Sequence, residues 1–411
     1  MPWRGSALSA DAVIGQLLLP EGVNRTVLPL LIGRALRAFA DGYVAVLLPV
    51  YLLALGFQSW EVGVLATATL LGSALTTLAV GAWGHHFRSR HLLLGAALLM
   101  TFTGFAMGSA FWPLLLIAFI GTLNPSSGDV SLFLPLEHAR LAEAAQGTAR
   151  TALFARYSLL GALFAAIGAL VAALPDRLVL LSGMTRIDAF RLMFVLYALV
   201  GFSVWLLYRR LPESHAEEPQ PPKPLDASRS VVLKLATLFS VDAFAGGLVV
   251  NSLLALWLFQ RFGLSLTTAG TFFFWAGLLT AASQLVAPRL AKRIGLLNTM
   301  VFTHIPANLC LIGAAFAPGL ETALGLLLLR ALLSQMDVPA RSAFVMSVVT
   351  PEERAAAASF TAVPRSLASA VSPSLGGALF AAGWWAAPLV ACGALKIAYD
   401  LTLWRAFQRF K

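Results

Sequence analysis

The sequence predicts an all-α membrane protein whose twelve transmembrane helices form two six-helix bundles related by a pseudo-two-fold axis. Three observations predict this class. The chain of 411 residues is 59% hydrophobic and only 12% charged, against about 25% charged residues in ordinary soluble domains. Its long uncharged runs can each cross about 30 Å of hydrocarbon. One long polar interval and a set of repeated charged positions divide the chain into two similar halves.

Twelve apolar segments are each long enough to cross the bilayer. They cover residues 28–54, 60–83, 92–110, 112–135, 149–174, 189–208, 231–259, 265–288, 299–317, 320–343, 355–382 and 385–407. Because lipid offers the backbone no hydrogen-bond partners, we expect each segment to be helical. Short polar links separate the segments and set their ends.

The longest polar interval, residues 209–230, reads RRLPESHAEEPQPPKPLDASRS and leaves six spans on each side. Its proline and charge content is typical of a flexible linker rather than of a folded domain. The sequence therefore predicts four regions. They are an N-terminal segment at 1–27, a first bundle at 28–208, the linker at 209–230 and a second bundle at 231–411.

Lys and Arg residues concentrate in the links that share one side of the membrane with both termini. This asymmetry is typical of cytoplasmic links. We therefore expect a multi-pass protein of the plasma (inner) membrane whose N-terminal segment, central linker and C-terminus are cytoplasmic. The net charge of +10 is spread over these links and is not gathered on one face. We expect the lipid bilayer as a partner and no nucleic acid.

The two halves of the chain repeat several charged positions in the same order. Asp129 is followed by Arg156 in the first half, and Asp337 is followed by Arg365 at nearly the same spacing in the second. An aspartate within the first span of each half and a basic link after the second span also recur. Such parallel repeats are typical of transporters built from a duplicated six-helix unit.

Together these features resemble the major facilitator superfamily over nearly the whole chain. The family's local marker is G-x-x-x-D-R-x-G-R-R between its second and third spans. Here the link reads GAWGHHFRSR, in which Gly81 and Arg90 match, while His85 replaces the acid and Arg88 replaces the second glycine. The segment LPVYL at 48–52 is similar to the end of span 1 in exporters of this superfamily. The resemblance implies a twelve-span transporter whose central cavity is lined by spans 1, 4, 7 and 10.

Charges inside the spans cost roughly 2.5–3.5 kcal/mol each on insertion scales, so they are seldom idle. Cations and anions there are nearly equal in number, which predicts mutual pairing. Asp41 lies about 20 Å and Asp242 about 16 Å from the cytoplasmic end of its span. Both acids are candidates for proton coupling or substrate contact, and Arg34 and Arg37 are candidate cavity cations. Alternatively each acid is locked to a cation, because both arginines share a helix face with Asp41.

The repeated Asp and Arg positions lie near the cytoplasmic ends of their spans. Asp129 with Arg156, and Asp337 with Arg365, would form charge pairs at the cytoplasmic mouth. A pair that parts in one state biases an alternating-access equilibrium, whereas a pair that never parts is a brace between helices. Both interpretations stay open, as does direct contact with a substrate.

Five further ionisable residues complete the set. Lys396 and Asp400 are spaced i, i+4 on the last span, which predicts a structural pair on one helix face. Arg330 has no acid near it in sequence and is the candidate cation for an anionic substrate group. We expect Glu137, at the end of span 4, to be solvated, and His304 to be hydrogen bonded within the packing of span 9.

No catalytic or nucleotide-binding motif accompanies the spans: the sequence lacks H-E-x-x-H, G-x-S-x-G and a phosphate loop. We expect no enzyme activity, no cofactor and no metal site, with energy taken from an ion or substrate gradient. The sequence predicts a monomeric secondary transporter that exports a small organic compound by proton-coupled antiport and alternating access. The alternative is uptake or facilitated transport of a small organic anion bound by Arg330, Arg34 or Arg37. An intramembrane enzyme and a transporter-like receptor also stay open, and transport by the purified protein in liposomes would separate them.

Overall fold

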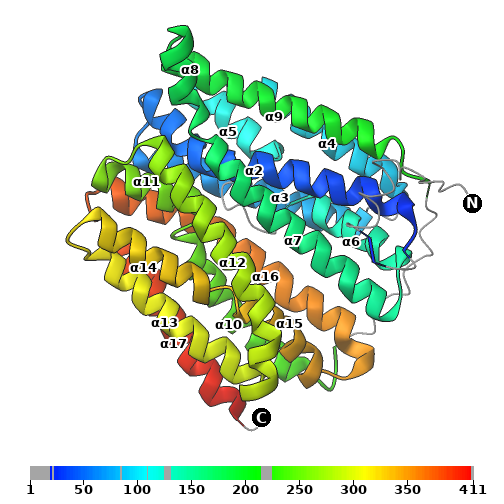
Figure 1. Cartoon of the computed structure of the whole chain (residues 1–411). Helices are drawn as coiled ribbons and strands as arrows, with labels where there is room; N and C mark the ends of the chain where they lie inside the picture. The colour runs from blue at the N-terminus through cyan, green and yellow to red at the C-terminus, as the bar shows by residue number, and fades with distance from the viewer. Residues whose placement is uncertain are drawn as a thin grey trace, which may run out of the picture.

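The computed structural model describes residues 19–20, 23–83, 86–108, 110–124, 131–213 and 225–408. Within these ranges all regular elements are helices, and they form two bundles that lie side by side (Figure 1). The first bundle contains η1 (Arg25–Val27), α2 (Leu28–Ala54), α3 (Ser59–Trp83), α4 (Ser89–Phe105), α5 (Phe111–Ile120), α6 (Phe133–Ala144), α7 (Gly147–Val171), α8 (Leu174–Ser182) and α9 (Arg186–Tyr208).

The second bundle follows with six passes in the same direction along the chain, but its first pass consists of two helices, and among its described residues no element corresponds to α8. It contains α10 (Arg229–Gly247), α11 (Asn251–Phe262), α12 (Leu266–Ile294), α13 (Leu296–Ala315), α14 (Leu320–Leu333), α15 (Asp337–Val348), η3 (Pro351–Glu353), α16 (Arg354–Ala381) and α17 (Ala387–Phe407). The predicted architecture of twelve passes in two bundles is confirmed. Among the described residues, eight helical segments are long and apolar enough to cross a membrane by length and composition alone.

Three of the twelve passes are broken into two helices each. The fourth pass is α5 and α6, on either side of residues 125–130, which lie outside the described ranges. The seventh breaks between α10 and α11, after Gly246 and Gly247, which weaken a helix by about 1 kcal/mol each relative to alanine. The tenth breaks between α14 and α15, because Pro339 has no N–H to offer the carbonyl of Gln335.

Helix α8 is an element that the sequence pattern did not predict. The pattern merged its start with the fifth span, whereas the structure ends α7 at Val171 and restarts a helix at Leu174. Pro175 stands in the first turn of α8, where a proline is well tolerated because the first N–H groups of a helix have no partner within it. In Figure 1, α8 lies at the opposite end of the molecule from the C-terminus.

The two ends of the molecule are distinguished here by the chain termini. The terminal face is the end at which α2 begins and α17 ends, and the far face is the end that carries α8 (Figure 1). Large apolar side chains such as Phe102, Phe316 and Trp384 are exposed on the outside of the bundles. This is the surface expected of helices that face lipid.

The bundles contact each other through α3 against α16 and through α7 against α12. The closest approach is at Gly377, where an added Cβ atom would lie 2.8 Å from the Cα atom of Gly63. Only a residue without a side chain lets the two backbones come so near. At the same level, Ser59 Oγ donates to Gln260 Oε1 over 2.9 Å. All four residues lie toward the far face, so the bundles are closed on each other there.

On the terminal face, the start of α10 is bound by an acid from another part of the second bundle. The carboxylate of Glu353 accepts the backbone N–H groups of Asp226, Ala227 and Ser228 over 2.8, 3.0 and 2.9 Å. These N–H groups precede and open the helix and have no partner within it. Hydrogen bonds from the Ser228 side chain and these backbone groups lower the pKa of Glu353 below its usual value.

Candidate functional site

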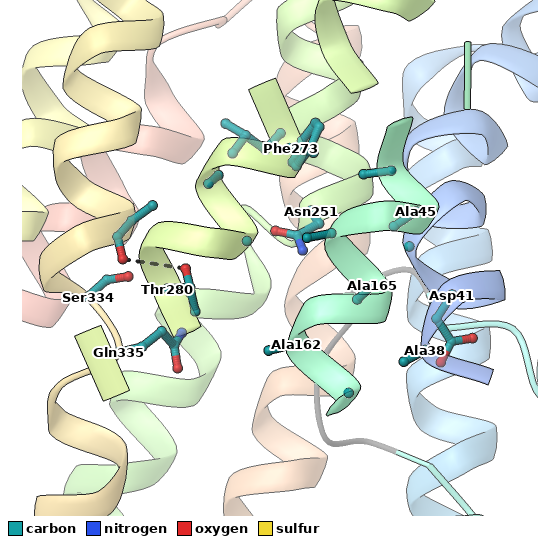
Figure 2. Close-up of a pocket in the computed structure, with 18 of the residues that line it drawn as sticks. Ala38, Asp41, Ala45, Ala162, Ala165, Asn251, Phe273, Thr280, Ser334 and Gln335 are labelled. Atoms are coloured by element: carbon teal, nitrogen blue, oxygen red, sulfur yellow. Dashed lines mark hydrogen bonds between the residues drawn. The ribbon is translucent and has the colours of Figure 1, made fainter. Parts of the chain in front are cut away.

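A cavity of about 360 Å³ lies between the two bundles. Its walls come from α2 and α7 on one side and from the α10–α12 and α14–α15 regions on the other (Figure 2). The polar residues that line it are Arg34, Asp41, Ser158, Asn251, Thr280, Gln284, Arg330, Ser334 and Gln335. Phe272, Phe273, Leu254 and Leu327 are the largest of the apolar residues that line it. A cavity of this size and mixed lining suits one small organic molecule.

Helix α7 gives the cavity its room, because it turns a row of small residues toward it. Gly161, Ala162, Ala165 and Ala169 recur at the spacing of one helix face. An added Cβ atom on Gly161 would lie 2.5 Å from Nε of Arg34. This glycine therefore makes the space in which the Arg34 side chain lies.

Two arginines and one aspartate carry charge on the described part of the cavity wall. Asp41 faces the cavity from α2 (Figure 2) and is hydrogen bonded to the Asn124 side chain. Arg34, from the same helix, lies with its guanidinium 5.3 Å from the centre of the Tyr157 ring. Arg330 reaches the cavity from α14 in the other bundle. The wall therefore has an excess of positive charge, as the anion-binding hypothesis requires.

Arg330 stands apart from the other cavity charges. Its Nε atom is buried and has no hydrogen-bond partner among the described residues. Among the described residues no carboxylate forms an ion pair with it, and the thiols of Cys310 and Cys392 lie in its surroundings. A guanidinium placed in this way leaves hydrogen-bond donors for a ligand.

Arg37, a predicted cavity residue, lies outside the cavity lining and is bound inside the first bundle. Its Nη1 and Nη2 atoms contact the two carboxylate oxygens of Glu137 over 2.5 and 2.7 Å. The hydroxyls of Tyr157 and Tyr208 donate to the same carboxylate. Glu137 is therefore fully buried, and the expectation that it is solvated was wrong. The bidentate geometry and the tyrosines provide the hydrogen bonds that a buried carboxylate needs.

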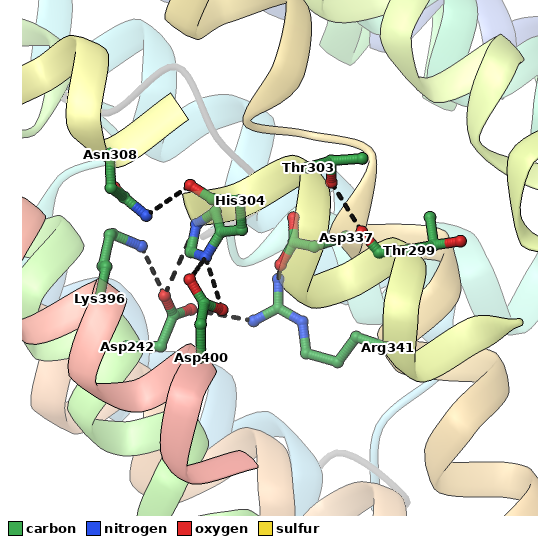
Figure 3. A network of polar contacts seen from close by, with 9 residues as sticks. All are labelled: Asp242, Thr299, Thr303, His304, Asn308, Asp337, Arg341, Lys396 and Asp400. Carbon is green, nitrogen blue, oxygen red and sulfur yellow. Dashed lines mark hydrogen bonds and ion pairs between the residues drawn. The ribbon is translucent and has the colours of Figure 1, made fainter. Parts of the chain in front are cut away.

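Asp242, the second predicted cavity acid, is also absent from the cavity lining. It is buried inside the second bundle, where Lys396 Nζ donates to one carboxylate oxygen over 2.6 Å. Arg341 Nη1 donates to the other over 3.2 Å, and Arg341 Nη2 contacts Asp337 over 2.9 Å (Figure 3). The contacts of Asp242 therefore agree with the alternative interpretation, in which this acid is locked to cations.

The predicted pair of Lys396 with Asp400 is not formed. Lys396 turns to Asp242 on α10, while Asp400 contacts Nδ1 of His304 on α13 over 3.0 and 3.1 Å (Figure 3). The i, i+4 spacing permits a pair along the helix, but partners on neighbouring helices come closer. His304 also lies 4.0 Å from Asp242 through Nε2.

Of the two predicted charge pairs at the cytoplasmic mouth, the structure contradicts one and does not test the other. Asp337 contacts Arg341 on its own helix, and not Arg365 on α16, so this predicted pair was wrong. Asp129 lies outside the described residues, and its pairing with Arg156 stays a prediction. Arg156 is half-buried, and its Nη1 atom has no hydrogen-bond partner among the described residues.

The link between the second and third spans lies on the terminal face. Arg88 Nη1 contacts Glu213 over 2.5 Å, and Arg90 Nη2 donates to the carbonyl of Arg209 over 2.7 Å. Gly81 is exposed near the end of α3, and His85 lies outside the described residues. The basic link is thus tied to the chain that leaves the sixth span. Among the described residues, no group of three or more His, Cys, Asp or Glu side chains is arranged to hold a metal ion.

The comparisons with known proteins agree with this architecture. A family model described as Major Facilitator Superfamily matches residues 30–336. In sequence, the chain is similar to the uncharacterized membrane protein YJR124C of Saccharomyces cerevisiae, with 24% identity over 409 residues. That alignment covers 90% of this chain and 91% of the yeast protein.

Three solved structures illustrate the similarity of fold. The nucleoside transporter NupG superposes with a TM-score of 0.72 at 15% identity, over 94% of this chain and 100% of that chain. A D-xylose-proton symporter gives 0.71 at 15% identity, over 92% and 97%. The human organic anion transporter MFSD10 gives 0.66 at 18% identity, over 92% and 99%. At these identities the likeness concerns the fold and not the substrate.

Proposed function

Because the chain belongs to the major facilitator superfamily, we propose that it is a secondary transporter that carries a small organic anion by alternating access. The observation that carries the proposal is the position of Arg330, which faces a cavity between two bundles with no carboxylate partner among the described residues. Arg34 lines the same cavity from the opposite bundle.

A guanidinium without a counter-charge inside the membrane costs several kcal/mol of free energy. An arginine is therefore expected at such a position only where it has a function. An anion bound in the cavity would supply the missing partner for Arg330. A second contact with Arg34 would join the two bundles through the ligand. Ligand binding then favours the arrangement in which both arginines reach the anion, which is the differential affinity that alternating access needs.

The same fold is known to serve this purpose in one protein, the human organic anion transporter MFSD10. That name belongs to the human protein and adds only that the architecture accommodates such a substrate. The Arg330 geometry is the argument for this chain.

We further propose that the terminal face is cytoplasmic and that the protein lies in a plasma (inner) membrane. The basic residues of the terminal-face links support this orientation. The bundles contact each other toward the far face, through Gly63, Gly377, Ser59 and Gln260. In this orientation the structure corresponds to a state that is closed on the outside and gives its cavity access from the inside.

A second candidate function is proton-coupled export of a small organic compound, with Asp41 as the proton carrier. The position of Asp41 on the cavity wall favours it, because a carboxylate there is within reach of both water and substrate. Asp242, the other predicted carrier, no longer supports this candidate through the cavity, since it is bound to Lys396 and Arg341. In this function the substrate would displace the proton from Asp41.

The experiment that tests the first candidate begins with purified protein and a thermal-shift screen of small carboxylates, organic phosphates and uncharged nucleosides. Ligands that stabilise the protein are then assayed by counterflow in liposomes. Arg330→Gln removes charge-assisted hydrogen bonds worth about 1.5–3 kcal/mol, which corresponds to a loss of affinity of about 10- to 150-fold. Arg330→Lys keeps the charge and should lose less.

Arg289→Gln is the matched control, because this exposed arginine of the same bundle donates only to the carbonyl of Leu285. Unchanged anion affinity in Arg330→Gln, or stabilisation by neutral compounds alone, would refute the anion proposal. Asp41→Asn separates the second candidate from the first. It should abolish transport driven by a pH gradient if Asp41 carries the proton, and full proton coupling in that variant would rule Asp41 out.

A further inference from the structure

We infer that His304 and Asp400 form a proton-binding site inside the second bundle, separate from the cavity, and that the charge of Arg330 controls its occupancy. The first part stands on the geometry of the buried network in Figure 3. The link to Arg330 rests on the proposed function, because there an anion neutralises this arginine.

The network holds more carboxylates than permanent cations. Asp242, Asp337 and Asp400 are its acids, and Lys396 and Arg341 are its permanent cations. Lys396 and Arg341 both contact Asp242, and Arg341 also contacts Asp337. Two positive charges therefore balance these two acids and leave Asp400 as the acid in excess.

Asp400 is completely buried, and its ionisable partner is His304. With a neutral imidazole, an ionised Asp400 would add an uncompensated negative charge to the interior, which is strongly unfavourable. One additional proton between Nδ1 of His304 and the Asp400 carboxylate makes the network neutral. This additional proton can lie on the nitrogen of His304 or on an oxygen of Asp400. In both cases the pair has taken up one proton from water.

The ionisable groups around this pair come from three neighbouring helices. They are Asp242 on α10, Asp337 and Arg341 on α15, and Lys396 and Tyr399 on α17. The ring centre of Tyr399 lies 6.3 Å from that of His304, and its buried hydroxyl has no hydrogen-bond partner among the described residues. Asn308 donates to the backbone carbonyl of His304 over 2.9 Å and helps to fix this part of α13.

The network is coupled to the cavity by charge. Cys392 lies on α17 one turn before Lys396 and interacts electrostatically with Arg330, Lys396 and Asp242. Arg330 and the network therefore have this neighbour in common, and in the proposed coupling the positive charge of the arginine opposes an added proton on the pair. An anion that neutralises Arg330 removes this opposition and favours the proton. By reciprocity the proton favours the anion, so the two are carried in the same direction.

The test needs no substrate, because it reads the proton from the pH dependence of stability. The melting temperature of the detergent-solubilised full chain is measured from pH 6 to pH 9. Above the ordinary histidine value of about 6.5, the unfolded chain releases the proton that the folded pair keeps. Stability should therefore fall as pH rises in this range. This decline should flatten in Asp400→Asn and in His304→Gln.

His91→Gln is the matched control, since it removes an exposed histidine of the terminal face and should retain the wild-type decline. Arg330→Gln imitates the bound anion, so its decline should continue to a higher pH than that of the wild type. If Asp400→Asn fails to fold, His304→Gln and Arg330→Gln still report on the pair. Identical pH profiles in wild type, Asp400→Asn and His304→Gln would overturn the proton site.

The outcomes also separate this inference from the proposed function. An Arg330→Gln profile equal to that of the wild type, with anion binding intact, would overturn the coupling alone. Absence of anion binding, with the predicted pH profiles intact, would refute the proposed function and leave the proton site standing.

Discussion

Replacing Glu137 with glutamine tests whether the charge cluster of the first bundle has the strength that its geometry implies. The substitution keeps the size of the side chain and an oxygen that can accept a hydrogen bond from a tyrosine. It removes the negative charge and leaves Arg37, which is 4% exposed, without a carboxylate partner. The perturbation therefore isolates the charge from the packing.

The expected loss of stability follows from the burial of both charges of the pair. Breaking a buried ion pair by removing one partner costs about 3–5 kcal/mol, because the other charge stays buried and uncompensated. Arg37 would keep its contact with Tyr208 and its position 4.0 Å over the ring of Phe133. These contacts recover only part of the loss. For a six-helix bundle of this size the melting temperature should fall on the order of 10 °C.

The assay is thermal unfolding of the purified protein in detergent, followed by tryptophan fluorescence or by size-exclusion recovery after heating. Glu143→Gln is the control, because it removes an exposed acid of the same helix and should change the melting temperature by little. A melting temperature for Glu137→Gln equal to that of this control would refute the conclusion that the cluster is a buried, charge-dependent link.

Two further predictions concern the far and terminal faces. Gly377→Ala should push α3 away from α16, because the new Cβ atom would meet backbone atoms at 2.6–3.0 Å; disulfide formation between cysteines placed at Ser59 and Gln260 should then decrease severalfold. Glu353→Gln should lower the melting temperature at neutral pH. Since folding lowers the pKa of Glu353, its contribution is complete above about pH 4.3 and is lost as pH falls through the folded-state pKa, so the deficit should shrink in acid.

Each of these variants has a control within the chain. Gly95→Ala adds a methyl group where an ideal Cβ meets nothing within 4 Å, so it should not alter the crosslink. Glu352→Gln removes the neighbouring, exposed acid and should show no deficit that changes with pH. Unchanged crosslinking in Gly377→Ala, or a Glu353→Gln deficit that stays constant into acid, would contradict the corresponding contact.

Much of the architecture was accessible from local sequence. The twelve passes follow from hydrophobic runs that each must span the bilayer on their own, and the division into halves follows from one polar interval. The break in the tenth pass has a local cause in Pro339. The breaks were nevertheless not predicted. The apolar run continues across each break, so a criterion based on the length of the run identifies one continuous segment.

The candidate site was predicted in part. The near balance of charges inside the spans correctly indicated mutual pairing, but not which charges pair. Spacing along one helix suggested that Lys396 meets Asp400 and that Arg37 pairs with Asp41, since these are the only distances a sequence shows. The structure chooses partners on other helices, where the geometry is set by packing. Arg34, Asp41 and Arg330 line the cavity, and the contacts of Arg34 with the Tyr157 ring and of Asp41 with Asn124 keep these two side chains at its wall.

Glu137 and Arg341 show why some buried charge pairs were not predicted. Both lie near the terminal-face ends of their passes, in segments that also contain residues expected in water. In the structure these segments are the short helices α6 and α15, which carry their charged side chains into the bundle. In the structure Glu137 and Arg341 are each the fifth residue of these helices, whereas the sequence repeat anchored on Asp129 and Asp337 would place Val345 opposite Glu137.

This structural equivalence connects the two charge clusters. Arg37 with Glu137 joins the first pass to the second half of the fourth, and Asp242 with Arg341 joins the seventh pass to the second half of the tenth. Both links join the first pass of a half to the second half of its fourth pass with the signs reversed, although by the repeat Asp242 corresponds to Asp41, and Arg37 lies one turn before that position. Because the attraction depends on the product of the charges, the fold needs a neutral link at this place and not a particular polarity.

The reversal has a consequence for how the halves differ. In the first half the acid of the link is surrounded by tyrosine hydroxyls, and its one cation closes the balance. In the second half the acid lies on the long helix, where it also attracts Lys396 from α17 and so releases Asp400 to His304. In the described part of the second bundle, the additional pairing of Asp242 with Lys396 therefore leaves Asp400 as the acid in excess. Proton binding is accordingly expected there, while the first bundle contributes Arg34 and Asp41 to the cavity.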